Sequence, residues 1–234
     1  MTTPLRIGYV PEHFSTPLHF AHTHFSLTST LIPFPSGTGH MITSLQSQEI
    51  DVAIGLTEGW VAGIGKAQEE GKEAGYRMVG TYVETPLCWA ISTGGGRGDV
   101  EGVEGLRGGK MGVSRVGSGS YVMGFVLADT HGWLNPPTTT TASSSSSSSS
   151  PPFEIIPLQT FANLRAAVNN GSADFFMWEH FTSKRYYTNG EIKRIGEIYT
   201  PWPSWHIVAR LGIVGDMRLE DMMQKLNEGV RREE

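Results

Sequence analysis

The chain has 234 residues, a formal net charge of -5 and 18% charged residues. Its Lys and Arg residues form no basic run, which argues against a nucleic-acid partner, because displacing counterions from phosphates needs clustered cationic side chains. The single cysteine, Cys88, excludes a disulfide framework and a cysteine-based metal site. No apolar run reaches the roughly 18 residues of a membrane span, so we expect no membrane insertion.

The first ten residues, MTTPLRIGYV, pass directly into a predicted strand and lack the basic-then-apolar pattern of a secretory signal. We therefore expect a cytoplasmic protein. The length suits one large or two small α/β domains.

The first third of the chain alternates predicted strands and helices. Residues 5–10 form a strand, and Ser15 or Thr16 is expected to cap the next helix, with Pro17 at its first position. A strand over residues 31–34, a turn over 36–39 and a helix to residue 48 follow. The unbroken apolar run 52–54 suits a strand covered on both faces, and another helix ends near residue 71. This order predicts a parallel sheet with right-handed crossovers.

The middle of the chain continues with predicted strands over residues 76–83 and 87–91. A glycine-rich surface excursion over 94–109, a strand over 110–113, a turn over 114–120 and an apolar helix over 121–127 follow. Residues 136–152 contain eight consecutive serines between prolines, and such a segment cannot bury enough apolar area to offset its chain entropy. We expect a disordered surface insertion there.

The last third repeats the plan of the first. Strands are expected over residues 153–157, 173–177, 192–198 and 205–209, with helices over 161–168 and 217–230. The order turn, helix, Asp51, apolar strand, Glu58 is echoed by turn, helix, Asp174, apolar strand, Glu179. We therefore expect two α/β lobes, with residues 1–84 and 206–234 in the first and 85–205 in the second. Their strand ends are expected to face a shared cleft.

Two glycine-bearing turns, at residues 36–39 and 117–120, each precede a predicted helix and so offer backbone donors and a positive dipole end. Helix capping explains them equally well. Glu12, Glu58 and Glu179 follow strand ends, and they could form an acid/base pair, bind N–H groups of a ligand, or lie solvated in turns.

The six tryptophans are the other candidates for ligand contact. Trp60 and Trp178 occupy corresponding places in the two half-plans, so they could sandwich a flat ligand or pack in the core. The same two interpretations apply to Trp202 and Trp205. The remaining two, Trp89 and Trp133, are assigned to the core.

Several chemistries lack their motifs. Neither turn has the spacing of a dinucleotide or phosphate-binding loop, and the histidines at 19, 22 and 24 have no cysteine or acidic partner at metal spacing. No G-x-S-x-G sequence occurs, and Cys88 lies in an apolar strand pattern. We expect no catalytic residue, no cofactor and no metal.

The chain resembles the type 2 periplasmic-binding-protein fold, in the branch that holds nitrate, sulfonate and taurine binders and fungal thiamine-pyrimidine-synthase-like proteins. It is most similar there to an intracellular fungal subgroup of uncharacterised binding-protein-like chains. The resemblance covers most of the chain outside residues 136–152 and the end. It is carried by the segments LRIGYVPEHFSTPLHFA, LIPFPSGTGHMITSL, EIDVAIGLTEGWVAGIGK, ETPLCWAIS, GKMGVSRVGSGSYVMGFVLA and ADFFMWEHFTSKRYYTNGEIKRIGEIYTPWPSWHIVA.

This resemblance implies an α/β fold of two hinged lobes with a small-molecule ligand in a central cleft. The matching positions, together with Trp60 from its place in the half-plan, give the candidate ligand contacts. These are Glu12, His13, Ser15, Thr16, Ser36, Gly37, Thr38, Thr57, Glu58, Trp60, Thr85, Ser114, Ser118, Gly119, Ser120, Trp178 and Glu179.

The pyrimidine synthase of this superfamily uses an N-terminal-half lysine for pyridoxal phosphate and a cysteine-rich iron motif. Here the first lysine is Lys66 and the sole cysteine is Cys88, so that reaction is not expected. The leading hypothesis is a binding protein without catalysis, for an aminopyrimidine or thiamine-precursor-like compound or a sulfonate-like one. An enzyme of the pyrimidine-precursor type and a degenerate, non-binding relative stay open as alternatives. Protein partners are not indicated.

Overall fold

The computed structural model describes residues 3–134 and 151–231. The chain forms two compact units, unit 1 with Met1–Pro86 and Pro201–Glu234, and unit 2 with Leu87–Thr200. The expected α/β fold with two lobes is confirmed. The expected disordered insertion at 136–152 lies outside the described residues except for its last two. Of these, Pro152 is buried, and its carbonyl accepts a hydrogen bond from the Gly108 N–H at 2.8 Å.

Unit 1 is built on a five-stranded sheet in the order β2-β1-β3-β10-β4. Strands β2, β1 and β3 are parallel, and β10 runs antiparallel to both β3 and β4. The elements are β1 (Arg6–Tyr9), η1 (His13–Ser15), α1 (Thr16–His24), β2 (Thr30–Pro33), α2 (Thr38–Gln46), β3 (Val52–Leu56), α3 (Thr57–Glu69), β4 (Tyr76–Val83), β10 (Trp205–Arg210), η3 (Leu211–Ile213) and α7 (Met217–Arg231).

Helices cover both faces of this sheet, because alternate residues of a strand point to opposite faces. Ile54 and Ile207 pack in one apolar cluster with side chains of α1 and α7. Ala53 and Val208, one residue away on the same strands, pack in the other cluster with α2 and Trp60 of α3. The fully apolar third strand predicted from the sequence is therefore buried on both faces.

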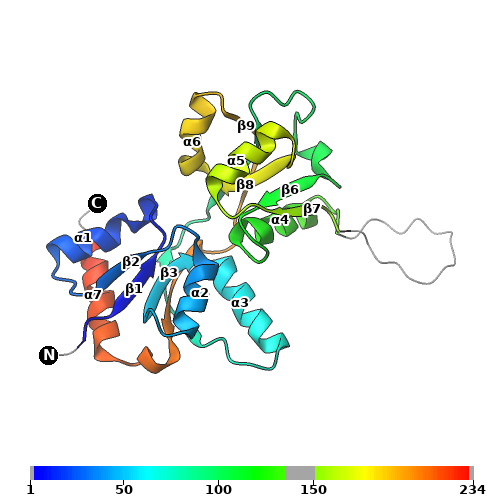
Figure 1. Cartoon of the computed structure of the whole chain (residues 1–234). Helices are drawn as coiled ribbons and strands as arrows, with labels where there is room; N and C mark the ends of the chain where they lie inside the picture. The colour runs from blue at the N-terminus through cyan, green and yellow to red at the C-terminus, as the bar shows by residue number, and fades with distance from the viewer. Residues whose placement is uncertain (1–2, 135–150, 232–234) are drawn as a thin grey trace. The chain divides into compact units, whose positions relative to one another are not determined.

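The last helix, α7, closes the first of these faces beside α1 (Figure 1). Its buried side chains are Leu219, Met222 and Leu226. A Cβ at Gly229 would lie 2.8 Å from the Pro17 carbonyl oxygen, so the absence of a side chain there lets the two helices approach closely.

Unit 2 has a sheet with the same plan, in the order β7-β6-β8-β5-β9. Strands β7, β6 and β8 are parallel, and β5 is antiparallel to β8 and β9. The elements are β5 (Cys88–Gly94), η2 (Val103–Leu106), β6 (Lys110–Val113), α4 (Gly119–Thr130), β7 (Glu154–Pro157), α5 (Phe161–Asn170), β8 (Phe175–Glu179), α6 (His180–Thr188) and β9 (Ile192–Tyr199).

Each face of the unit 2 sheet is again apolar. Phe176 packs in a cluster with Leu164 and Val168 of α5. The preceding residue, Phe175, points to the opposite face, where α4 packs, and its ring meets that of Phe153 edge-on at a centroid distance of 5.1 Å. Helix α6, which follows β8 directly, was not predicted. The residues of α6 are mostly polar, and Ser183 is the one that is buried. The helix therefore lacks the apolar periodicity that predicts a helix from a sequence.

The echo between the two halves is visible in the strand registers. Ile7 is opposite Val52 in unit 1, and Met111 is opposite Phe175 in unit 2. The echoed aspartates have corresponding roles as well. Asp51 accepts a hydrogen bond from the backbone N–H of Arg6, the first residue of β1, and Asp174 accepts one from that of Lys110, the first residue of β6.

The chain passes between the units at residues 86/87 and 200/201. The expected lobe limits were 84/85 and 205/206. The second limit differs because Trp205, expected in the second lobe, is opposite Leu56 in the unit 1 sheet. In unit 1 the Ser204 hydroxyl donates to the Thr85 carbonyl at 2.7 Å. In unit 2 the N–H of Leu87 donates to the Thr200 hydroxyl oxygen at 2.9 Å.

Candidate functional site

The carboxyl edge of the unit 1 sheet collects most of the candidate residues. Strands β1, β2 and β3 end at this edge because they are parallel, while β10 begins there because it runs the other way. Strand β4 ends there too, being antiparallel to β10. The five segments at the edge are residues 10–16, 34–38, 56–60, 83–86 and 201–206. They contain three glutamates, Glu12, Glu58 and Glu84, and no Lys or Arg.

Glu58 is the most unusual of these residues. It lies in the first turn of α3, and only 3% of its surface is exposed. The indole N–H of Trp202 donates to its Oε2 at 3.1 Å, while its Oε1 is buried and has no hydrogen-bond partner among the described residues. Burial raises the pKa of Glu58 to about 7, although the hydrogen bonds from its own backbone N–H and from Trp202 act in the opposite direction.

Thr57, the residue before Glu58, fixes the segment that carries Trp202. Its hydroxyl donates to the carbonyl of Pro203, and its N–H donates to the carbonyl of Ser204 at 3.0 Å. Because that hydroxyl is already a donor, it accepts from Nδ1–H of His206 at 2.8 Å. Burial lowers the pKa of His206, which favours the neutral ring.

The predicted turn at residues 36–39 starts α2 and packs on the start of α3. Gly37 is the N-cap residue with a φ of 76°, a region that favours glycine. The Thr38 hydroxyl accepts a hydrogen bond from the N–H of Leu56 at 3.0 Å. A Cβ at Gly59 would lie 2.8 Å from Cγ2 of Thr38, so the two helix starts are in close contact. Ser36 lies between the end of β2 and Gly37.

The loop after β1 carries Glu12, His13, Ser15 and Thr16. Ser15 was expected to cap α1, but its hydroxyl donates to the carbonyl of Glu12 at 2.7 Å and caps no helix N–H. The Thr16 hydroxyl donates to the His13 carbonyl at 2.7 Å in the same way. These two hydroxyls therefore stabilise the short η1 turn itself.

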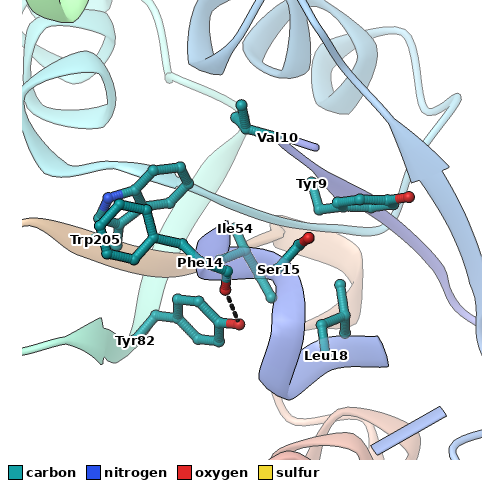
Figure 2. Close-up of a pocket in the computed structure, with 8 residues that line it drawn as sticks. All are labelled: Tyr9, Val10, Phe14, Ser15, Leu18, Ile54, Tyr82 and Trp205. Carbon is teal, nitrogen blue, oxygen red and sulfur yellow. Dashed lines mark hydrogen bonds between the residues drawn. The ribbon is translucent and has the colours of Figure 1, made fainter. Parts of the chain in front are cut away.

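An apolar pocket lies under this loop, lined by Tyr9, Val10, Phe14, Ser15, Leu18, Ile54, Tyr82 and Trp205 (Figure 2). It is too narrow for a water molecule. The Tyr82 hydroxyl donates to the Phe14 carbonyl at 2.6 Å, and the Phe14 and Trp205 rings pack 5.1 Å apart. The pocket is therefore a gap in the packing, and the contacts of Phe14 beside it hold the loop on the sheet.

Of the two interpretations given for Trp60 and Trp205, their burial supports core packing. Trp60 lies inside α3, is 0% exposed and packs on Tyr76, so its side chain belongs to the unit 1 core. Trp205 is also buried. The strand registers make Gly55, not Trp60, the counterpart of Trp178. A Cβ at Gly55 would lie 2.8 Å from the Trp60 ring, so the ring occupies the space next to this glycine.

In unit 2 the second group of candidates lies at the carboxyl edge of β6 and β8. Ser118 caps α4 by accepting from the N–H of Tyr121 at 3.4 Å, and its hydroxyl is 3.0 Å from that of Ser120. Gly119 is the first residue of the helix, and Ser114 follows β6 directly. All four candidates are buried. Burial lowers the pKa of Arg115, the one cation in this loop.

Trp178 and Glu179 end β8 at the same edge. The Trp178 ring stacks on Phe161 at 4.9 Å with an interplanar angle of 16°. Both carboxylate oxygens of Glu179 are occupied, since Oε1 accepts from the N–H of Phe181 at 2.8 Å and Oε2 from the N–H of Thr182 at 2.6 Å. Glu179 is thus the N-cap of α6, whereas Oε1 of Glu58 has no hydrogen-bond partner among the described residues. The two glutamates of the echo have different roles.

Two groups that contact Thr57, the Pro203 carbonyl and His206, were not predicted as contacts, whereas Trp202, which contacts Glu58, was one of the tryptophans left open between ligand contact and core. All three lie in the segment PWPSWH, residues 201–206, whose last two residues begin β10. A sequence signal was present, because a strand that returns to a parallel sheet in antiparallel direction begins at the carboxyl edge. Thr85, a predicted contact, accepts a hydrogen bond from Ser204 of this segment through its carbonyl.

No helix in residues 3–134 and 151–231 is long and apolar enough to cross a membrane. Within the same residues, no group of three or more His, Cys, Asp or Glu side chains could hold a metal ion.

The chain is similar to proteins of known structure over nearly its whole length. It shares 39% identity with the Candida albicans CA3427 gene product, covering 99% of this chain and 72% of that one with a TM-score of 0.84, and that protein defines a family with the generic periplasmic-binding-protein fold. A family model described as Ca3427-like PBP matches residues 89–198. The chain belongs to this Ca3427-like family.

Two more distant structures share the fold of the family. The alkanesulfonate-binding protein SsuA from Xanthomonas axonopodis pv. citri, bound to MOPS, is 16% identical with a TM-score of 0.71, and the match covers 97% of this chain and 73% of that one. An ancestral arginine-binding protein bound to arginine is 20% identical with a TM-score of 0.62, with 99% and 94% covered. No curated protein matches the chain. Because one of these ligands is a sulfonate and the other a cationic amino acid, the fold alone does not choose a ligand class.

Proposed function

We propose that this protein binds a compact small molecule through residues at the carboxyl edge of the unit 1 sheet, without catalysing a reaction on it. The observation that carries the proposal is the buried carboxylate of Glu58, one oxygen of which has no hydrogen-bond partner among the described residues. The membership of the chain in a family with the periplasmic-binding-protein fold supports a solute-binding role.

An unpartnered buried carboxylate oxygen is costly to keep. Leaving a charged group buried without its hydrogen bonds costs more than the 1–3 kcal/mol typical of a neutral group. Most buried polar groups in proteins are paired, so an unpaired one at the edge where open α/β sheets bind ligands supports a ligand-binding role. Glu179 at the corresponding edge of unit 2 has its oxygens paired instead, which supports a special role for Glu58.

We assign the ligand contacts of unit 1 to Glu58 and the surfaces of Glu12, Ser36 and Thr85 at the same edge. The ligand classes that the proposal admits are amino-bearing heterocycles such as aminopyrimidines and thiamine-precursor-like compounds, and sulfonates. Trp60 is left out, because its ring is enclosed in the core.

A thermal-shift panel tests the proposal. Aminopyrimidines, alkanesulfonates, nitrate and phosphorylated metabolites are added separately to the full chain. A ligand present at 100 times its dissociation constant adds about 2.7 kcal/mol to the free energy of unfolding, which raises the melting temperature by several degrees at this size. Glu58→Gln is expected to remove the shift, while Glu69→Gln, on an exposed position at the far end of the same helix, is expected to keep it. A panel with no shift by any compound would reject solute binding in these classes.

A further inference from the structure

We propose that the carboxyl edge of unit 1 selects a ligand group that presents N–H donors, such as an amidinium or an aminated heterocycle, and rejects sulfonates and carboxylates. This inference rests on the proposed function and narrows the ligand classes it admits. It is drawn from three features of the edge, namely the open oxygen of Glu58, the amides around it and the charges of the five edge segments.

The open oxygen needs a donor. An ionised carboxylate only accepts hydrogen bonds, and here Trp202 satisfies Oε2 while Oε1 has no partner among the described residues. A ligand N–H group placed against Oε1 forms a charge-assisted hydrogen bond, which is shorter and stronger than a neutral one. A sulfonate or carboxylate at the same place offers only further acceptor oxygens and a like charge in a buried setting.

Three of the backbone amides at the start of α3 that could hold an anion are already used. Helix N-termini bind anions through free N–H groups. Here the N–H of Leu56 donates to the Thr38 hydroxyl at 3.0 Å, and that of Thr57 donates to the Ser204 carbonyl at 3.0 Å. The next N–H, that of Glu58, is hydrogen-bonded to its own side chain. These three amides at the positive end of the helix therefore serve the protein's own groups.

The charges of the edge point the same way. Its five segments hold Glu12, Glu58 and Glu84 and contain no Lys or Arg. The remaining titratable groups of these segments are His13 and His206, and burial lowers the pKa of His206, which favours its neutral form. Positively charged ligand groups are attracted to such an edge and anions are repelled by it.

Two sets of small probes that differ only in the head group test this inference. The methyl set is acetamidinium, acetate and methanesulfonate, and the phenyl set is benzamidinium, benzoate and benzenesulfonate. Binding of each probe to the full chain is measured by isothermal titration calorimetry at pH 8, in the wild type, Glu58→Gln and Glu69→Gln. Glu69→Gln is the matched control, since it removes one carboxylate from an exposed position of the same helix.

We expect the amidinium members to bind the wild type and the Glu69→Gln variant, and to bind Glu58→Gln about 10-fold or more weakly, because a charge-assisted hydrogen bond is lost. The head-group preference of the wild type is informative even if Glu58→Gln does not fold. Preference for a sulfonate or carboxylate member overturns the inference and leaves solute binding intact. Amidinium binding that is equal in wild type and Glu58→Gln also overturns the inference alone. No binding by any of the six probes, nor by MOPS, overturns the inference and counts against the proposed function as well.

Discussion

Replacing Glu58 by glutamine is expected to change how the free energy of unfolding depends on pH. The pKa of Glu58 is about 7 in the folded chain, against an ordinary value of 4.5. Between these two values the folded chain binds a proton that the unfolded chain has released. The wild type therefore loses stability as pH rises through this window, and the loss is complete above the folded pKa. Glutamine does not titrate, so the variant lacks this loss.

The size of the effect follows from the two pKa values. Their difference, at 1.36 kcal/mol for each pKa unit, corresponds to about 3 kcal/mol of stability lost by the wild type between pH 4.5 and pH 8. The amide of the variant also leaves one polar atom unpaired, which costs about 1 kcal/mol or more at every pH. Because that cost is constant, the change of the difference with pH isolates the titration of Glu58.

Urea unfolding followed by circular dichroism, at pH 4.5, 6, 7 and 8, measures this difference. His206, whose ring contacts Thr57, titrates nearby in both proteins, so its contribution cancels in the comparison. A second variant, Trp202→Phe, removes the indole donor and is expected to raise the pKa of Glu58 further. Its pH dependence should therefore move to higher pH than that of the wild type.

Glu69→Gln serves as the control and should run parallel to the wild type, because its carboxylate is exposed. If the Glu58→Gln curve is also parallel to the wild-type curve over this range, Glu58 is ionised in the fold at ordinary pH. The argument from burial would then be refuted, whatever the two stabilities are.

Three further changes test the fold around the site. Leu226→Ala, in the buried side of α7, is expected to lower the free energy of unfolding by about 2–5 kcal/mol, whereas Met217→Ala, at an exposed position of that helix, should stay within about 0.5 kcal/mol in the same urea titration. Glu179→Ala removes the N-cap of α6 and should cost about 0.5–2 kcal/mol, part of which Glu179→Asp restores; equal losses would contradict the capping role. Asp51→Asn removes a carboxylate that is paired with Arg6 and Arg210. Burial raises the pKa of this carboxylate, but the two arginines lower it by more. The wild type should lose stability as pH falls below about 4, because this carboxylate protonates there in the unfolded chain while it stays ionised in the folded one. The variant should lose less, as acid titration by circular dichroism will show.

Local patterns in the sequence were enough to predict the plan of each lobe. The apolar run before Glu58 requires a strand buried on both faces, and the chain supplies helices for both. The spacing of Asp51 and Asp174 in the two halves corresponds to matching hydrogen bonds in the two sheets. Helix α6 escaped prediction because its sequence is polar and it buries only Ser183, so its start depends on the carboxylate of Glu179.

The strand registers make Leu56, the N-cap of α3, the counterpart of Glu179. In the sequence, however, Glu58 and Glu179 each follow an apolar strand and have the same options. Only the tertiary structure separates them, because their partners come from different parts of the chain. Glu179 finds its donors two and three residues away, at the start of its own helix. Glu58 is buried by a segment 144 residues further along, whose tryptophan satisfies one oxygen and leaves the other open. Short-range patterns fix which residues reach the end of a strand, but the solvation and pairing of a charge there depend on contacts between distant segments.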